Sequence, residues 1–281
     1  MLKLFFAIVI SAWLGGCASK PEAPVLNNLT GSALSETAAR IDALLPADFL
    51  LLGEQHDAKE HQQIYQQVIA LLAQRGLLAA VALEMADTGA TTARLHPSST
   101  EQQTKSALKW NDKSWPWEAY GPAVMTAVRA GVPVLGANLP REQMRPKMQD
   151  AALDGQLPGP ALKAQQQLIR IGHCDLLPES QITPMTRIQI ARDISMAEAL
   201  GKAALPGKVV VLLAGSGHAD RLLGVPQHLP AALDAKAVRM RAGAALEADK
   251  AEAFDAVWQT RALPEKDYCA EFKKPIGTMG K

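Results

Sequence analysis

Four short apolar runs dominate the pattern of hydrophobic and polar positions along the chain. They lie at residues 49–52, 78–85, 132–138 and 208–214. Continuous apolar runs of this length are typical of strands that are buried on both faces of a parallel sheet. Two weaker runs, at 237–240 and 255–258, predict further short strands.

Between these runs the apolar residues fall at helical spacing. Ile64, Val68 and Leu72, for example, predict an amphipathic helix between the first two strands. A strand–helix–strand order of this length indicates a right-handed crossover with parallel strands. Two helical segments without strand patterns, about 86–120 and 141–205, predict a lid or insertion subdomain. The expected fold is therefore α/β: a mainly parallel sheet flanked by helices, with a helical lid.

Polar side chains follow each of the four main runs. Glu54 and His56 follow the first, Glu84 ends the second, Asn138 ends the third and His218 follows the fourth. Ligands of open parallel sheets bind outside the carboxyl ends of the strands, where neighbouring strands lie about 5 Å apart. The sequence therefore predicts one polar crevice at this edge. The glycine at position 53 is expected to turn the chain as its strand ends.

Imidazole and carboxylate groups at one edge allow two kinds of chemistry. His56, His218 and Glu54 could hold a divalent metal, since these are ordinary ligands of zinc and iron. A metal-dependent periplasmic hydrolase would use Glu54, Glu84 and Arg192 as its catalytic residues, beside His56 and His218. The alternative is that each histidine only satisfies local hydrogen bonds.

The start of the chain predicts export and lipid attachment. Residues 1–16 hold one lysine followed by an apolar stretch and small residues, which is typical of a signal peptide. Leu14-Gly15-Gly16-Cys17 resembles a bacterial lipobox, which implies lipidation of Cys17. Ala18 after the cysteine implies the outer membrane, with the protein facing the periplasm. Residues 17–34 would be a tether.

Charge and cysteine content narrow the remaining possibilities. The formal net charge of +1 gives no general attraction to nucleic acid. Residues 35–260 are expected to form the α/β domain, and 261–281 a charged tail. Cys174 and Cys269 could pair in an oxidising compartment or stay separate thiols, and Cys174, which follows His173, could be a ligand.

Taken in order, the motifs of the chain resemble those of the ChaN family. They lie at 52–57, 83–85, 117–120, 137–141, 173–178, 189–197 and 214–226. The resemblance spans about residues 48–230. It implies a haem-binding lipoprotein of iron uptake that stores haem or hands it over, with a TonB-dependent haem receptor or a periplasmic haem carrier as partner.

The same resemblance bears on the binding residues. It implies haem at a dimer interface with tyrosine ligation, and Tyr65, Tyr120, His61 and His173 are the candidates for contacting haem. Members of the family often carry a His-His pair where this chain has His61-Gln62. The family also resembles Tiki proteases, TraB proteins and erythromycin esterases, which implies an inherited site. That site would consist of Glu54, His56, Glu84, Arg192 and His218.

Overall fold

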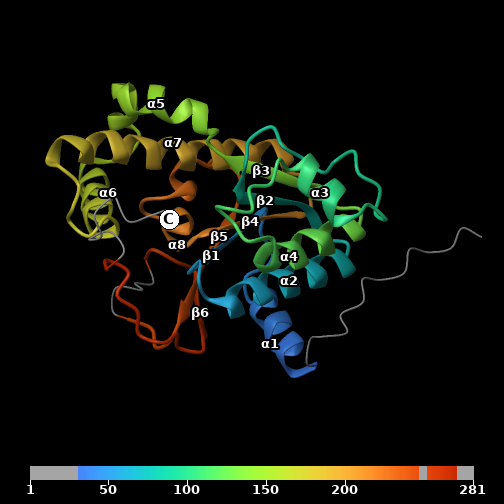
Figure 1. Cartoon of the computed structure of the whole chain (residues 1–281). Coiled ribbons are helices and arrows are strands. Elements are labelled where there is room, and N and C mark those ends of the chain that lie inside the picture. The colour runs from blue at the N-terminus through green and yellow to red at the C-terminus, as the bar shows by residue number, and fades with distance from the viewer. Residues whose placement is uncertain (1–30, 247–251, 271–281) are drawn as a thin grey trace, which may run out of the picture.

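A six-stranded parallel sheet forms the centre of the computed structural model, which describes residues 31–246 and 252–270 (Figure 1). The strands are β1 (Phe49–Glu54), β2 (Leu78–Asp87), β3 (Val134–Asn138), β4 (Val209–Gly215), β5 (Ala235–Ala242) and β6 (Ala256–Thr260). Their order is β3-β2-β4-β1-β5-β6, and each neighbouring pair is parallel. The predicted fold class is confirmed. The leader, Cys17 and most of the tether lie outside the described residues.

Helices cover both faces of this sheet. They are α1 (Gly31–Asp42), α2 (Lys59–Gln74), α3 (Glu101–Ala107), α4 (Trp117–Arg129), α5 (Arg141–Gln149), α6 (Gly159–Gly172), α7 (Glu179–Ala203) and α8 (Ser216–Ala219), with 3₁₀ turns η1 (Ala151–Gly155) and η2 (Val225–His228). None of them, within the described ranges, is long and apolar enough to cross a bilayer.

Successive side chains of each strand point to opposite faces of the sheet, so the core has two layers. Leu50 and Leu52 of β1 pack with α2 and α4 on one face, whereas Phe49 and Leu51 pack with α7 on the other. All four side chains have no exposed surface. The apolar run at 49–52 therefore reads as continuous because both faces of β1 are covered.

The segment 141–205 is helical, as the sequence pattern predicts, but it is more than a lid. Met196, Ala197 and Leu200 of α7 belong to the core on one face of the sheet. Only the amino-terminal part of the segment packs away from the sheet, around Leu139, Leu153 and Ile190. In Figure 1, α5 lies above α7, on the side away from the strands, and α6 lies at the left end of α7.

Strand order determines which side chains meet. β4 lies between β1 and β2, with Glu54 opposite Gly215 and Leu83 opposite Leu213. The carboxyl ends of β1, β4 and β2 therefore lie side by side at one edge of the sheet. This brings the residues after each apolar run to one edge.

Gly53 has a different role from the one predicted. It lies inside β1 rather than at a turn, and a Cβ there would be 2.8 Å from Ser216 Cα and 2.9 Å from Ala219 Cβ. Both atoms belong to α8, the short helix that carries His218. The absence of a side chain at Gly53 lets α8 approach the sheet.

Replacing Gly53 by Ala should lower the free energy of unfolding by about 1–3 kcal/mol, since backbone of α8 has to move. Urea unfolding followed by circular dichroism measures the change. The matched control is Gly201→Ala in α7, where an added Cβ has nothing within 4 Å. That control should gain up to about 1 kcal/mol from helix propensity. An unchanged urea midpoint for Gly53→Ala would contradict the close-approach role.

Candidate functional site

A polar cleft of about 560 Å³ opens at the carboxyl ends of β1, β2 and β4. Its walls come from the loop after β1, the end of β2, helices α7 and α8, and the tail. The lining residues are Glu54, Gln55, His56, Asp57, Glu84, Gln189, Arg192, Gly215, Ser216, Gly217, His218, Lys266 and Tyr268. The volume is in the range of small-molecule sites.

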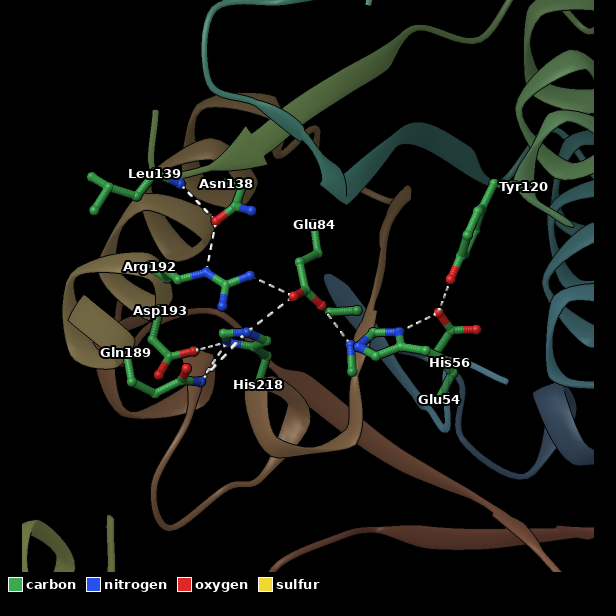
Figure 2. Close-up of polar contacts among 12 residues, drawn as sticks. Glu54, His56, Glu84, Tyr120, Asn138, Leu139, Gln189, Arg192, Asp193 and His218 are labelled. Atoms are coloured by element: carbon green, nitrogen blue, oxygen red, sulfur yellow. Dashed lines mark hydrogen bonds and ion pairs between the residues drawn. The ribbon is translucent and has the colours of Figure 1, made fainter. Parts of the chain in front are cut away.

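One group of hydrogen bonds surrounds Glu54, whose side chain is buried. Its Oε1 atom accepts from the Tyr120 hydroxyl at 2.7 Å and lies 2.8 Å from His56 Nδ1 (Figure 2). Its Oε2 atom accepts from the Gln62 amide at 2.5 Å. The His56 side chain is 45% exposed. Its other nitrogen, Nε2, lies 2.9 Å from where a Cβ on Gly215 would be. A buried carboxylate therefore orients an accessible imidazole.

The surroundings of His56 favour its charged form. Burial disfavours charge on the ring, but the hydrogen bond to Glu54 and the negative charges of Glu84 and Glu54 outweigh it and raise the pKa of His56. Burial and the adjacent Glu54 also raise the pKa of Tyr120, so its hydroxyl stays a donor. The His56 ring can thus take up or release a proton at the cleft.

A second group surrounds Glu84, which is 3% exposed. Its Oε1 atom accepts from Arg192 Nη2 at 2.6 Å and lies 3.4 Å from His218 Nε2. Its Oε2 atom accepts from the backbone N–H of Gly215 at 2.7 Å. The other nitrogen of His218 lies 2.5 Å from Asp193 Oδ1. His218 is therefore held between two carboxylates, as Figure 2 shows.

These contacts set the charges of the second group. Burial disfavours the imidazolium, but Glu84 and Asp193 overcome this and raise the pKa of His218 to about 9. Burial likewise opposes ionisation of Glu84, yet His218 and Arg192 hold the pKa of Glu84 well below its usual range. Burial raises the pKa of Asp193. At neutral pH Glu84 is an anion facing two cations.

Five residues predicted to share a site do meet in this cleft. They are Glu54, His56, Glu84, Arg192 and His218. Asn138 supports them, because its Oδ1 atom accepts from Arg192 Nε at 2.9 Å. Their predicted roles as catalytic or metal-binding groups remain predictions.

The predicted haem-contacting residues lie elsewhere or are engaged in other bonds. Tyr65 has no exposed surface, and its hydroxyl lies 3.0 and 3.1 Å from the carbonyl oxygens of Leu52 and Ala214. Tyr120, 2% exposed, is bonded to Glu54. His173 is the residue after α6, where its Nδ1 atom lies 2.8 Å from the Ile169 carbonyl oxygen.

His61 is a structural residue in this arrangement. It has no exposed surface, its Nδ1 atom accepts from the Gln55 backbone N–H, and its Nε2 atom lies 3.0 Å from Thr260 Oγ1. Burial lowers the pKa of His61 to about 4, so the ring is neutral. The next residue, Gln62, stands where the family often has a second histidine and bonds Glu54.

The predicted metal ligands His56, His218 and Glu54 line the same cleft, but they are not grouped as a metal site. Among residues 31–246 and 252–270, no three His, Cys, Asp or Glu side chains are grouped so that they could hold a metal ion. The physical reason is pairing: His56 is bonded to Glu54, and both nitrogens of His218 face carboxylates. The hypothesis of a metal-dependent hydrolase therefore has no metal site to support it within these described residues.

Two features of the cleft were not predicted from the sequence. Lys266 and Tyr268 come from the tail, and Cys174 and Cys269 form a disulfide that ties the tail to the loop after α6. The sequence left open whether these cysteines pair. Had the pairing been known, it would have predicted that the tail lies near the site.

Comparisons with known proteins agree with the resemblance. The family described as "Haem-binding uptake, Tiki superfamily, ChaN" matches residues 40–229. A solved structure, "Cofacial heme binding to ChaN of Campylobacter jejuni", is 25% identical with a TM-score of 0.63, and the match covers 78% of this chain and 90% of that chain. The type III effector HopBA1 is 15% identical with a TM-score of 0.45, covering 81% of this chain and 94% of that one. No curated protein matches.

The charge on His218 gives a pH dependence with a definite sign. A pKa raised from 6.5 to about 9 adds stability that is complete below about pH 6.5 and is lost as the pH rises through about 9. Nitrogen-15 NMR of labelled histidines should show the His218 ring charged at neutral pH, while His61 stays neutral down to about pH 4. A neutral His218 ring at pH 7 would contradict the placement of this ring between the carboxylates of Glu84 and Asp193.

Proposed function

We propose, since the chain belongs to the ChaN family of haem-binding uptake proteins in the Tiki superfamily, that it binds haem at the polar cleft. The observation that carries the proposal is the family match over residues 40–229. The C. jejuni ChaN structure, which has this fold and is described as binding haem, supports it.

The residues of the cleft fit the chemistry of haem. Haem iron is held in proteins by His, Tyr, Cys or Met side chains. Two accessible side chains of these kinds line the cleft, His56 and Tyr268, with exposed fractions of 45% for the His56 side chain and 48% for Tyr268. Lys266 supplies a positive charge for a propionate, whereas Arg192 is already paired with Glu84. When bound, haem would supply the iron, and these residues would hold and orient it.

The location of the protein is part of the same proposal. The lipobox predicts an outer-membrane lipoprotein that faces the periplasm and is attached through Cys17. The Cys174–Cys269 disulfide supports an oxidising compartment outside the cytoplasm. Storage or hand-over of haem, with an uptake receptor or a periplasmic carrier as partner, and the homodimer follow from the family resemblance alone.

Haemin titration tests the binding. Protein lacking residues 1–17 should give a saturable shift of the Soret band, because a side chain replaces water at the iron. The matched control is His96→Ala, since His96 is an exposed histidine on a loop outside the cleft. That variant should titrate as the parent does. Absence of a saturable shift in the parent would contradict haem binding.

Membrane attachment is tested separately by Cys17→Ser in the full-length chain. Loss of the acylated thiol should move the protein from the membrane fraction to the soluble fraction and abolish its labelling with radioactive palmitate. Cys269→Ser, which removes a cysteine outside the lipobox, should keep the label. Palmitate incorporation by Cys17→Ser would contradict attachment at this residue.

A further inference from the structure

Part of the cleft wall comes from a segment that the family match does not reach. The match ends at residue 229, whereas the described part of the tail, residues 261–270, supplies Lys266 and Tyr268 to the cleft. This segment forms no helix or strand, and none of its residues is buried. What the tail does at the cleft is therefore a separate question from family membership.

The tail separates the cleft from a neighbouring cavity of about 440 Å³. The two spaces share the lining residues Gln55, Ser216, Lys266 and Tyr268. On one side the second cavity is lined by residues 239–242 of β5, and on the other by residues 262–266 of the tail. Displacing the tail would join the two spaces into one wider groove and open one wall of the cleft.

Few noncovalent contacts hold the tail in this place. At its start, the Arg261 backbone N–H donates to Glu60 Oε2 at 2.9 Å. Near its end, the Tyr268 hydroxyl donates to Asp57 Oδ2 at 2.8 Å and accepts from the Gln55 amide at 3.2 Å. All three bonds lie at the exposed surface, where water competes for the same groups. A segment with so little buried surface opens easily by local fluctuation.

The Cys174–Cys269 disulfide supplies the restraint that these contacts lack. Cys269 directly follows Tyr268, and its partner lies in the loop between α6 and α7, 95 positions earlier in the chain. In Figure 1 the tail runs below α6, the helix that leads to Cys174. Both cysteines are partly exposed, so a thiol in solution has access to the bond. The covalent link that keeps the tail closed can therefore be broken in the folded protein.

We propose that residues 261–270 are a strap over the cleft and that the Cys174–Cys269 disulfide is a redox-sensitive switch that keeps the strap closed. A dithiol reductant opens it. One thiolate of the reductant attacks a sulfur of the disulfide, and the second thiolate then displaces the mixed disulfide. Two electrons and two protons pass to the two cysteines, and the reductant leaves as a disulfide. Exchange with an oxidised dithiol reverses the step.

Opening of the strap changes how fast a ligand enters and leaves the cleft. While the strap is closed, a ligand beside His56 has to leave past Lys266 and Tyr268, which slows its release. Once the strap is open, that wall is gone and release is faster. The effect on haem rests on the haem binding proposed above, whereas the opening itself does not. Retention and hand-over of haem would then belong to two redox states of one chain.

The opening is measured first without haem, in the full-length Cys17→Ser chain. This parent keeps Cys174 and Cys269 as its remaining cysteines. Reduction with dithiothreitol should speed hydrogen exchange at residues 262–270 by about tenfold or more, because a restrained segment is released. The matched control is the Cys174→Ser/Cys269→Ser double variant, in which exchange at 262–270 should be fast with or without the reductant.

Access to the cleft is measured by chemical modification of His56. Diethyl pyrocarbonate should modify His56 faster in the double variant than in the oxidised parent, because the cleft wall has opened. His96, an exposed loop histidine outside the cleft, should be modified at the same rate in both proteins. Neither measurement involves a ligand, so both are independent of the proposed function.

The effect on haem is measured by transfer to an excess of a haem-free globin. The double variant should release haem about tenfold faster than the oxidised parent, since changes at a binding site act mainly on the dissociation rate. The Soret band should keep its position, because no residue that lines the cleft has changed. No reductant is present in this comparison, so the oxidation state of the iron is untouched.

The outcomes separate the strap from the proposed function. If reduction leaves exchange at 262–270 unchanged, the disulfide is not the switch. If the tail loosens but His56 modification and haem release keep the parent's rates, the tail does not close the cleft. Either result overturns the proposal. If the parent binds no haemin, the proposed function fails, while exchange at 262–270 and modification of His56 still decide the strap.

Discussion

The geometry of the cleft depends on the pairing of one buried anion, Glu84. Its two oxygens accept bonds from Arg192 of α7 and from the backbone of β4, and His218 of α8 lies against it. Three elements that are distant in sequence from Glu84 are thereby oriented around its carboxylate. Removing one partner of a buried ion pair costs about 3–5 kcal/mol, because the other charge is left unpaired. Glu84 therefore holds the end of the sheet together as well as setting its charge.

Glu54 is the centre of the other group of hydrogen bonds. It holds the His56 imidazole where the ring is accessible from the cleft. Tyr120 and Gln62 hold the carboxylate in place, and His56 extends from it into the cleft. His218 is buried between acids, whereas half of the His56 side chain is open. His56 and His218 each stand three residues after a glycine, Gly53 or Gly215, but they differ in role. His218 is a fixed charge, and His56 can meet a ligand.

The sequence predicted the sheet and the meeting of Glu54, His56, Glu84 and His218, because apolar runs indicate burial on both faces and parallel strands share one carboxyl edge. Arg192 was expected there only from the family resemblance. The sequence could not give the order β2-β4-β1, which depends on long-range pairing. It also misjudged Gly53, since the approach of α8 is invisible in local sequence. Tyr268 was missed because its position depends on a disulfide, and two cysteines alone do not show whether they pair.

Haem is proposed to bind in the cleft at the carboxyl end of the sheet, beside the tail that the Cys174–Cys269 disulfide joins to the loop after α6. The most direct test is a crystal structure of the haem complex with anomalous data collected at the iron edge. An iron peak inside the cleft, within reach of His56 or Tyr268, is the expected result. An iron peak away from this edge of the sheet would contradict it.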